Sequence, residues 1–212
     1  MKKLLTFVLA LSMVASTCLY AQAVKKNKPK TDEKVGETDT LLFYGCTVWP
    51  ISSIYFIQTD TSLPPSFYQN NQYGNYYYGE AISGSFYKCT FAEIYIANTT
   101  YFNEYGLGIP NGFDFVLPKE KDKIVYLGIK NRDGTIADGT IYDDIFYAKN
   151  KSPEEKTKSL KKGELKLRIK AIKAMRTKYK GTKWDPILKE ELEKVENLQK
   201  KLKKGEDLGD EE

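Results

Sequence analysis

The sequence predicts an α+β protein: an antiparallel β-sandwich or small β-barrel-like domain followed by a C-terminal helical hairpin. An apolar run and a charged leader come first, short aromatic and β-branched runs fill the middle, and two amphipathic patterns with helical spacing close the chain. The parts we expect are a signal peptide (1–23), a charged flexible tether (24–37), a β-sandwich-like domain (38–150), a helical hairpin packed on or beside it (151–204) and an acidic disordered tail (205–212).

The N-terminus is typical of a secretory signal. Lys2 and Lys3 precede an apolar run, and Ala21-Gln22-Ala23 has the small-residue pattern that signal peptidase cleaves. The run is about 11 residues long, whereas a bilayer-spanning helix needs about 20. We therefore expect cleavage after Ala23 and an exported protein, either periplasmic, at the cell surface or secreted.

Cys18 leaves a second outcome open. A cysteine between an apolar run and a charged tether is the layout of bacterial lipoproteins, but Thr17 stands where such signals place a smaller residue. Stable anchoring needs more than one acyl chain. We expect a membrane association only if Cys18 is lipidated.

The β domain is predicted from short runs bounded by turn residues. The runs are Thr40–Trp49, Ser53–Thr59, Phe91–Asn98, Phe113–Leu117, Lys123–Lys130 and Thr135–Tyr142. The absence of helix-period segments between them favours antiparallel pairing. The segment 124–127 is apolar on both faces, which suits a central strand, and Asp133-Gly134 predicts a turn.

Two cysteines remain once the leader is removed, and both fall within the β domain. In an exported chain Cys46 and Cys89 are able to form one disulfide. Such a bond would contribute about 4 kcal/mol in the chain-entropy model. The alternative is two buried free thiols, since unpaired cysteine is among the most buried residue types. The spacing does not decide between them.

Two helices are predicted over the region 152–204. Ser152-Pro153 is an N-cap followed by a first-turn proline, and Gly181 is a helix stop. Asp185-Pro186 then predicts a second N-cap followed by a first-turn proline. The apolar stripes are Leu165, Ile169, Ile172, Met175 and Tyr179 in the first helix, and Leu188, Leu192, Val195, Leu198 and Leu202 in the second. A short connection favours an antiparallel hairpin.

Charge alternates along the chain. Residues 38–150 have a net charge of −5, residues 151–183 of +10 and residues 184–212 of −4. The lysines of the first helix could meet anionic lipid or nucleic acid, but export argues against nucleic acid. We interpret them as a solvated face above an apolar stripe packed on the acidic β domain.

Most site chemistry is excluded. The chain has no histidine, which rules out histidine-based nucleophile activation and histidine-ligated metals, and no phosphate-binding glycine motif. Carboxylates remain, but no spacing singles out a pair among Glu80, Glu93, Glu104, Asp114, Asp143 and Asp144. The run Asp133, Asp138, Asp143 and Asp144 does not fit a calcium loop. We expect no enzyme, no cofactor and no metal.

The segment 64–86 is the most unusual part of the sequence, because aromatic residues alternate there with Asn, Gln and Gly. Its candidate ligand-binding residues are Tyr68, Tyr73, Tyr76, Tyr77 and Tyr78. Tyrosine provides rigid amphipathic contact area for protein or sugar ligands. An aromatic hairpin that covers one end of the domain is the alternative. The expected function is a non-catalytic envelope module that binds a protein or glycan; the alternative is a structural or assembly protein using its helices.

Overall fold

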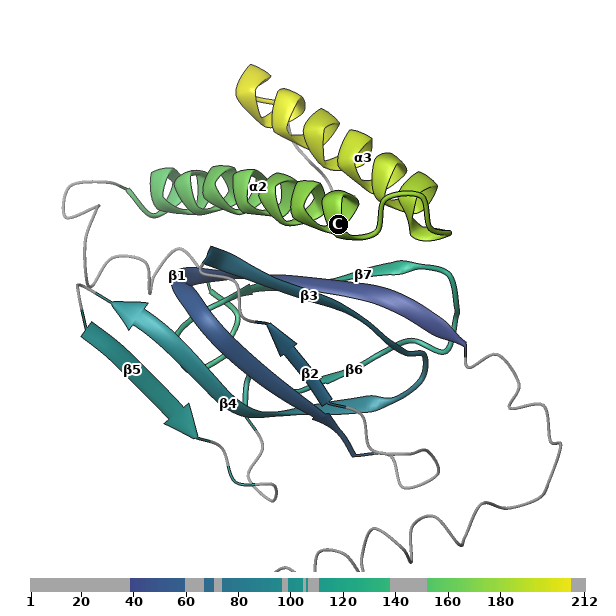
Figure 1. The fold of residues 1–212 in the computed structure, drawn as a ribbon. Helices are drawn as coiled ribbons and strands as arrows, with labels where there is room; N and C mark the ends of the chain where they lie inside the picture. Colours follow the sequence, from purple (N-terminus) through teal and green to yellow (C-terminus); the bar gives the residue numbers. More distant parts are fainter. Residues whose placement is uncertain are drawn as a thin grey trace, which may run out of the picture. The chain divides into compact units, whose positions relative to one another are not determined.

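A computed structural model describes residues 39–59, 67–70, 74–96, 99–104, 106, 111–137 and 152–206. Within these residues, seven strands form one sheet and two helices follow (Figure 1). The strands are β1 (Thr40–Gln58), β2 (Phe67–Asn70), β3 (Gly74–Ile82), β4 (Phe86–Ile96), β5 (Thr99–Glu104), β6 (Phe115–Val116) and β7 (Ile124–Lys130). The helices are α2 (Pro153–Lys178) and α3 (Trp184–Lys204). The expected signal peptide, the tether and Cys18 lie outside the described residues.

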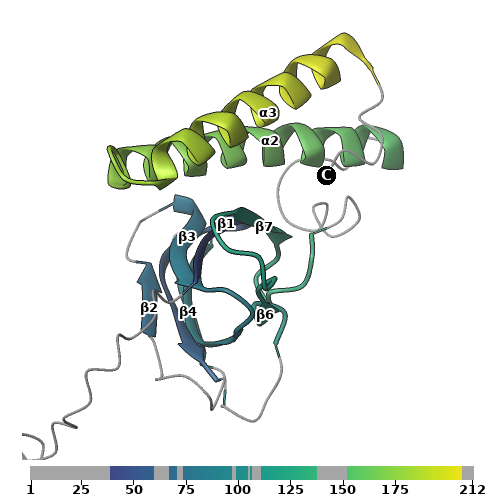
Figure 2. The same ribbon diagram turned by 90° about the vertical axis from the view of Figure 1, so that its right-hand side faces the viewer.

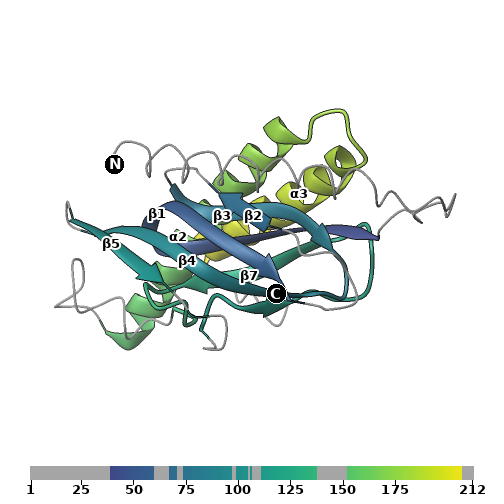
Figure 3. The same ribbon diagram turned by 60° about the horizontal axis from the view of Figure 1, so that its bottom comes forward.

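β1 organises the sheet, because its two halves have different neighbours. The first half pairs antiparallel with β3 and parallel with β7, and the second half pairs antiparallel with β2 and β4. The register with β3 shifts between Cys46 and Ile51. Pro50 falls in this interval and has no N–H to donate to a ladder. The shift lies where β1 bends, and the sheet curls with it (Figures 1 and 3).

The predicted α+β class with a helical hairpin is confirmed, and the barrel-like alternative describes the β part better than a two-sheet sandwich. β4 extends the sheet by pairing antiparallel with β5 and β6, which gives a half-barrel. The expected central position of β7 stays a prediction, because residues 138–150 lie outside the described residues. Among the described residues it pairs with β1 alone, apart from one bridge between Lys130 and Ile136.

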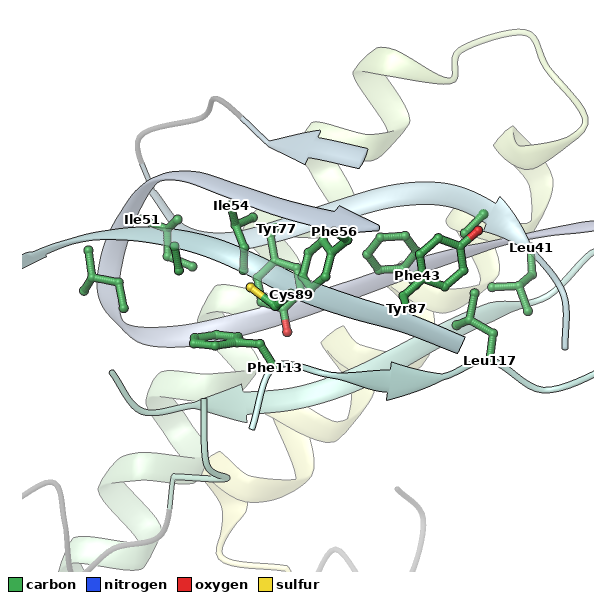
Figure 4. Close-up of a cluster of buried hydrophobic side chains, with 13 residues drawn as sticks. Leu41, Phe43, Ile51, Ile54, Phe56, Tyr77, Tyr87, Cys89, Phe113 and Leu117 are labelled. Atoms are coloured by element: carbon green, nitrogen blue, oxygen red, sulfur yellow. The ribbon is translucent and has the colours of Figure 1, made fainter. Parts of the chain in front are cut away.

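Alternate residues of β1 face two separate cores. Leu41 and Phe43 point into the curl, where the Phe43 ring packs with those of Phe56 and Tyr87, and Phe113 lies farther along the same cluster (Figure 4). The interior also contains Ile51, Ile54, Tyr77, Ala81, Cys89, Ala92, Ile94 and Leu117. This aromatic-rich cluster fills the concave side of the sheet and leaves the other side of β1 for the helices.

The helices cover the outer face of the sheet, opposite the curl (Figure 2). Leu42 and Tyr44 of β1 join Ile172 and Met175 of α2 and Leu188 of α3 in a second core. Both predicted apolar stripes are therefore packed, as an antiparallel hairpin requires. Neither described helix combines the length and apolar character needed to cross a bilayer.

Of the two predicted helix N-caps, only the first is found in the structure. Ser152 caps α2, its hydroxyl accepts from the Glu155 N–H, and the Glu155 carboxylate accepts in return from the Ser152 N–H. The prediction that Asp185 caps the second helix was wrong. α3 begins at Trp184, whose indole is buried, and Asp185 lies in the first turn, where its charge still favours the helix dipole.

Candidate binding groove on the helical hairpin

Two of the candidate tyrosines are core residues. Tyr77 is 0% and Tyr78 2% exposed, because consecutive residues of β3 face opposite sides of the sheet. Tyr77 fills the curl and Tyr78 packs beneath the helices. The expectation that these two contact a ligand is therefore corrected. Tyr76 is half-buried and its ring lies 6.3 Å from that of Tyr78.

The rest of this segment does not form the expected loop. Residues 67–70 and 74–82 are strands β2 and β3, both antiparallel to β1. β2 lies beside the second half of β1 and β3 beside its first half, so these two strands do not form the hairpin of the alternative interpretation either. The backbone of Tyr68 belongs to β2, while its side chain and the whole of Tyr73 lie outside the described residues.

Cys46 and Cys89 are free and fully buried, which is the second of the two alternatives left open by their spacing. They belong to different clusters. Cys89 lies in the curl (Figure 4), whereas Cys46 packs with Ile129 and Leu160 near the helices. Burial raises the pKa of Cys89 to about 12 and raises that of Cys46 further. Neither thiol is in a state suited to nucleophilic chemistry.

Three of the candidate carboxylates have separate structural partners. Glu80 accepts from the Thr40 hydroxyl at 2.8 Å, and Glu93 from the Ser53 hydroxyl at 3.0 Å. Glu104 ends β5 and is exposed. Asp114 forms a buried ion pair with Lys88 at 3.1 Å, and also accepts from the backbone N–H of Cys89.

The calcium candidates are equally accounted for where they are described. Asp133 accepts from the Thr135 N–H and hydroxyl, and the hydroxyl bond in particular lowers the pKa of this carboxyl. It is a turn residue. Asp138, Asp143 and Asp144 lie outside the described residues. Among the residues that are described, no group of three or more acidic or cysteine side chains is placed to hold a metal ion.

A buried polar network fastens the hairpin to the sheet. The Tyr44 hydroxyl donates to Glu191 Oε1 at 2.7 Å, and Arg168 donates to the Tyr44 oxygen at 3.1 Å and to Glu191 at 3.3 Å. The Arg168 guanidinium lies 4.2 Å from the centre of the Tyr126 ring. The Tyr126 hydroxyl in turn donates to Glu164 at 2.6 Å. These contacts join strands β1 and β7 to helices α2 and α3.

The charges of this network are fixed around neutral pH. Burial raises the pKa of the Tyr44 and Tyr126 phenols well above their ordinary value. Burial acts to lower the pKa of Arg168, but Tyr44, Tyr126 and Glu191 outweigh it and the pKa is raised. Arg168 therefore stays cationic and both phenols stay neutral. We assign this network to the attachment of the hairpin, not to chemistry.

A groove of about 590 Å³ lies along one flank of the hairpin, where α2, α3 and the sheet meet. It is lined on α2 by Gly163, Lys166, Leu167, Ile169, Lys170 and Lys173, on α3 by Glu196, Gln199, Lys200 and Lys203, and on the sheet by Val48 and Asn75. Five of these side chains are lysines and one is acidic. A smaller hollow of about 160 Å³ adjoins it, lined by Lys158, Lys162, Gln199, Leu202 and Lys203.

The lysines of the groove are incompletely neutralised. The Lys173 ammonium lies 3.5 Å from the Glu196 carboxylate, and that of Lys200 lies 3.5 Å from the Asn197 amide oxygen. Lys166, Lys170 and Lys203 have no carboxylate within 4.0 Å in the part of the chain that is described. Since Lys166, Lys170 and Lys173 are about one helical turn apart, the groove presents a row of cations to solvent.

The sequence indicated the lysine face but not the groove. The helical spacing of Lys166, Lys170 and Lys173 placed them on one side of α2, but only the approach of α3 encloses the space beside them. Arg168 belongs to the same basic stretch but is buried. Its position between Leu165 and Ile172, on the apolar stripe, is the signal that it is buried.

No protein-family model, curated protein or solved structure matches this chain.

Proposed function

We propose that this chain is an exported, non-catalytic binding module of the cell envelope, and that the lysine groove is its binding surface for an acidic glycan. The observation that carries the proposal is the groove itself, with five lysines, one glutamate and a volume of about 590 Å³. A row of cations at helical spacing suits a polymer that repeats a negative charge along its length.

The groove also offers what a sugar chain needs besides charge. Amide side chains from Asn75 and Gln199 stand among the lysines, and the aliphatic side chains of Leu167 and Ile169 are half-buried in its walls. Amides hydrogen-bond hydroxyl groups, and aliphatic carbons pack against sugar rings. Gly163 adds open space, since a Cβ at this position would meet no atom within 4 Å.

Export rests on the sequence pattern at the N-terminus, and it has its own test. If signal peptidase cleaves after Ala23, the intact mass of the exported protein corresponds to a chain that begins at Val24. A mass that corresponds to an acylated N-terminal Cys18 would instead make the protein a membrane-anchored lipoprotein.

The non-catalytic part of the proposal rests on residue chemistry. The chain has no histidine, its two described cysteines are buried with raised pKa values, and Asp114 is engaged in a buried ion pair. None of these groups faces the groove. The lysines and amides of the groove supply charge and hydrogen-bond donors, which are sufficient to bind an acidic glycan.

An affinity measurement with matched variants tests the groove. Oligoalginate, a linear polymer of uronic acids, is titrated against the chain and against a double variant with Lys170→Gln and Lys203→Gln. Each exposed charge pair contributes about 0.2–1 kcal/mol, so we expect a loss of about fivefold in affinity at low salt. The control carries Lys180→Gln and Lys189→Gln, two exposed lysines outside the groove.

The control separates a site from net charge. If both double variants lose the same affinity, binding depends on overall charge and the groove is not the site. If neither the chain nor the variants bind oligoalginate above the level of neutral maltohexaose, the acidic-glycan proposal is wrong. A loss confined to the groove variant supports it.

The alternative of a structural or assembly protein has less support. It needs an apolar helix face that is open to a partner, but Leu188, Val195 and Leu198 of α3 are 0–4% exposed. They pack against the sheet and α2 in one cluster. The groove that the hairpin does line is rich in lysine and not apolar.

A further inference from the structure

We propose that the acidic segment, residues 206–212, is an intramolecular ligand of the lysine groove and competes there with external polyanions. This inference deepens the proposed function and rests on the same groove. The segment has five acidic residues and no basic residue. It follows α3 directly, and the last turns of that helix contribute Lys200 and Lys203 to the groove.

α3 ends at Gly205 in a Schellman motif. Gly205 adopts the left-handed conformation, with φ 80° and ψ 14°, and the Glu206 N–H donates to the Lys201 carbonyl at 3.2 Å. This hydrogen bond satisfies one of the last carbonyls of the helix. The Glu206 carboxylate also lies 3.7 Å from the Lys204 ammonium. The first acidic residue thus already meets a lysine of the last turn.

The segment has the length to follow the groove. Seven residues span at most about 23 Å when extended. From Lys203 back to Glu196, the α3 side of the groove rises about 10 Å, at 1.5 Å per residue. The adjoining hollow adds Lys158 and Lys162 beside Lys203. The acidic segment can therefore reach the lysines of both hollows without any change in the helices.

Charge complementarity and tethering act together. The segment carries five negative charges and the groove five lysines with one glutamate. A short tether gives an attached ligand an effective concentration in the millimolar range, so individually weak pairs suffice to occupy the groove. An external polyanion then binds only the fraction of molecules whose groove is open, which lowers its apparent affinity.

Two variants of the whole chain test the competition. One ends after Gly205, and the other keeps the length but carries Glu206→Gln, Asp207→Asn, Asp210→Asn, Glu211→Gln and Glu212→Gln. We expect both to bind oligoalginate at least about threefold more tightly than the parent chain at low salt. The difference should shrink as added salt screens the segment's own pairs.

A second measurement detects the contact without any external ligand. A water-soluble carbodiimide activates a carboxyl group, a lysine amine that touches it forms an amide bond, and the reagent leaves as a urea. We expect mass spectrometry of the monomer to find amide links from residues 207–212 to Lys170, Lys200 or Lys203. Links to exposed Lys180 and Lys189 at equal yield would indicate random collision.

The outcomes distinguish this inference from the proposed function. If the parent chain binds oligoalginate in the groove but neither variant gains affinity and no selective links form, the acidic segment is not a ligand and the groove proposal stands. If the links form but oligoalginate binds none of the chains, the segment occupies the groove and the acidic-glycan function is wrong.

Discussion

Replacing Arg168 tests how the hairpin is fastened to the sheet. Arg168→Met keeps most of the side-chain volume but removes the donor to Tyr44 and Glu191 and the cation above the Tyr126 ring. Glu191, whose side chain is only 13% exposed, then loses its cationic partner. Its remaining hydrogen bond comes from the Tyr44 hydroxyl.

The expected loss follows from this geometry. Removing one member of a buried ion pair costs about 3–5 kcal/mol, because the other charge is left without compensation. The Tyr44 hydroxyl and the partial exposure of Glu191 reduce that penalty. We therefore expect Arg168→Met to lower the free energy of unfolding by about 2–4 kcal/mol. A typical domain has a free energy of unfolding of about 5–15 kcal/mol, so the expected loss is about a third of it.

Urea unfolding followed by circular dichroism measures this loss. Adding Glu191→Gln to Arg168→Met removes the stranded charge and should restore about 1–2 kcal/mol. Lys166→Met on the same helix is the matched control, since this side chain is exposed and should change stability by less than about 0.5 kcal/mol. A loss for Arg168→Met as small as that of the control would refute the assigned role.

Three further predictions concern the cores. Gly45→Ala would drive a Cβ into the Tyr77 ring, so we expect a loss of about 1–3 kcal/mol in urea unfolding; an unchanged midpoint would show that the ring has room to move. Leu192→Asp buries a charge beneath the hairpin, where the side chain is 7% exposed, and should lower stability by more than about 3 kcal/mol; a wild-type melting temperature would contradict the packing of α3. Cys46 and Cys89 should react slowly with a thiol reagent at pH 8 in the native state, because their raised pKa values leave almost no thiolate. Both should react once the chain is unfolded. If neither thiol reacts under non-reducing, denaturing conditions, the two cysteines form a disulfide and the prediction is wrong.

The fold class could be predicted because local patterns and global structure agree. The Ser152 cap and the apolar stripes of the hairpin are local signals, and the structure forms helices where they indicate. The runs 40–49 and 53–59 were read as two strands, yet they are one strand bent near Pro50. Proline donates no hydrogen bond to a ladder and is found mainly at strand starts, edges and bulges, so the sequence favours two strands. In the structure β1 continues through Pro50, and its two halves pair with different strands.

The tyrosine segment shows where composition misleads. Tyr, Asn and Gly are typical of binding loops, but they also suit a strand that is covered on both faces. Tyr77 fits beside Gly45, which has no side chain to exclude the ring, and Tyr78 lies under α2. The pairing of β3 with β1 is a contact between residues far apart in the sequence, and nothing local specifies it.

The groove could be predicted only in part. Its lysines were visible at helical spacing, but the space between α2 and α3 depends on the angle at which the helices diverge. The two helices are joined by the Arg168–Glu191 contact and by a shared core that includes Trp184 and the packed leucines. A surface feature of this kind is a consequence of the core beneath it.

Lysine footprinting tests most directly whether the groove is the binding surface. The chain is treated with an acetylating reagent with and without oligoalginate, and modification is quantified at each lysine by mass spectrometry. Our account predicts that oligoalginate protects Lys166, Lys170 and Lys203 while Lys180 and Lys189 react as before. Equal protection at all exposed lysines, or protection at Lys180 and Lys189 alone, would contradict it.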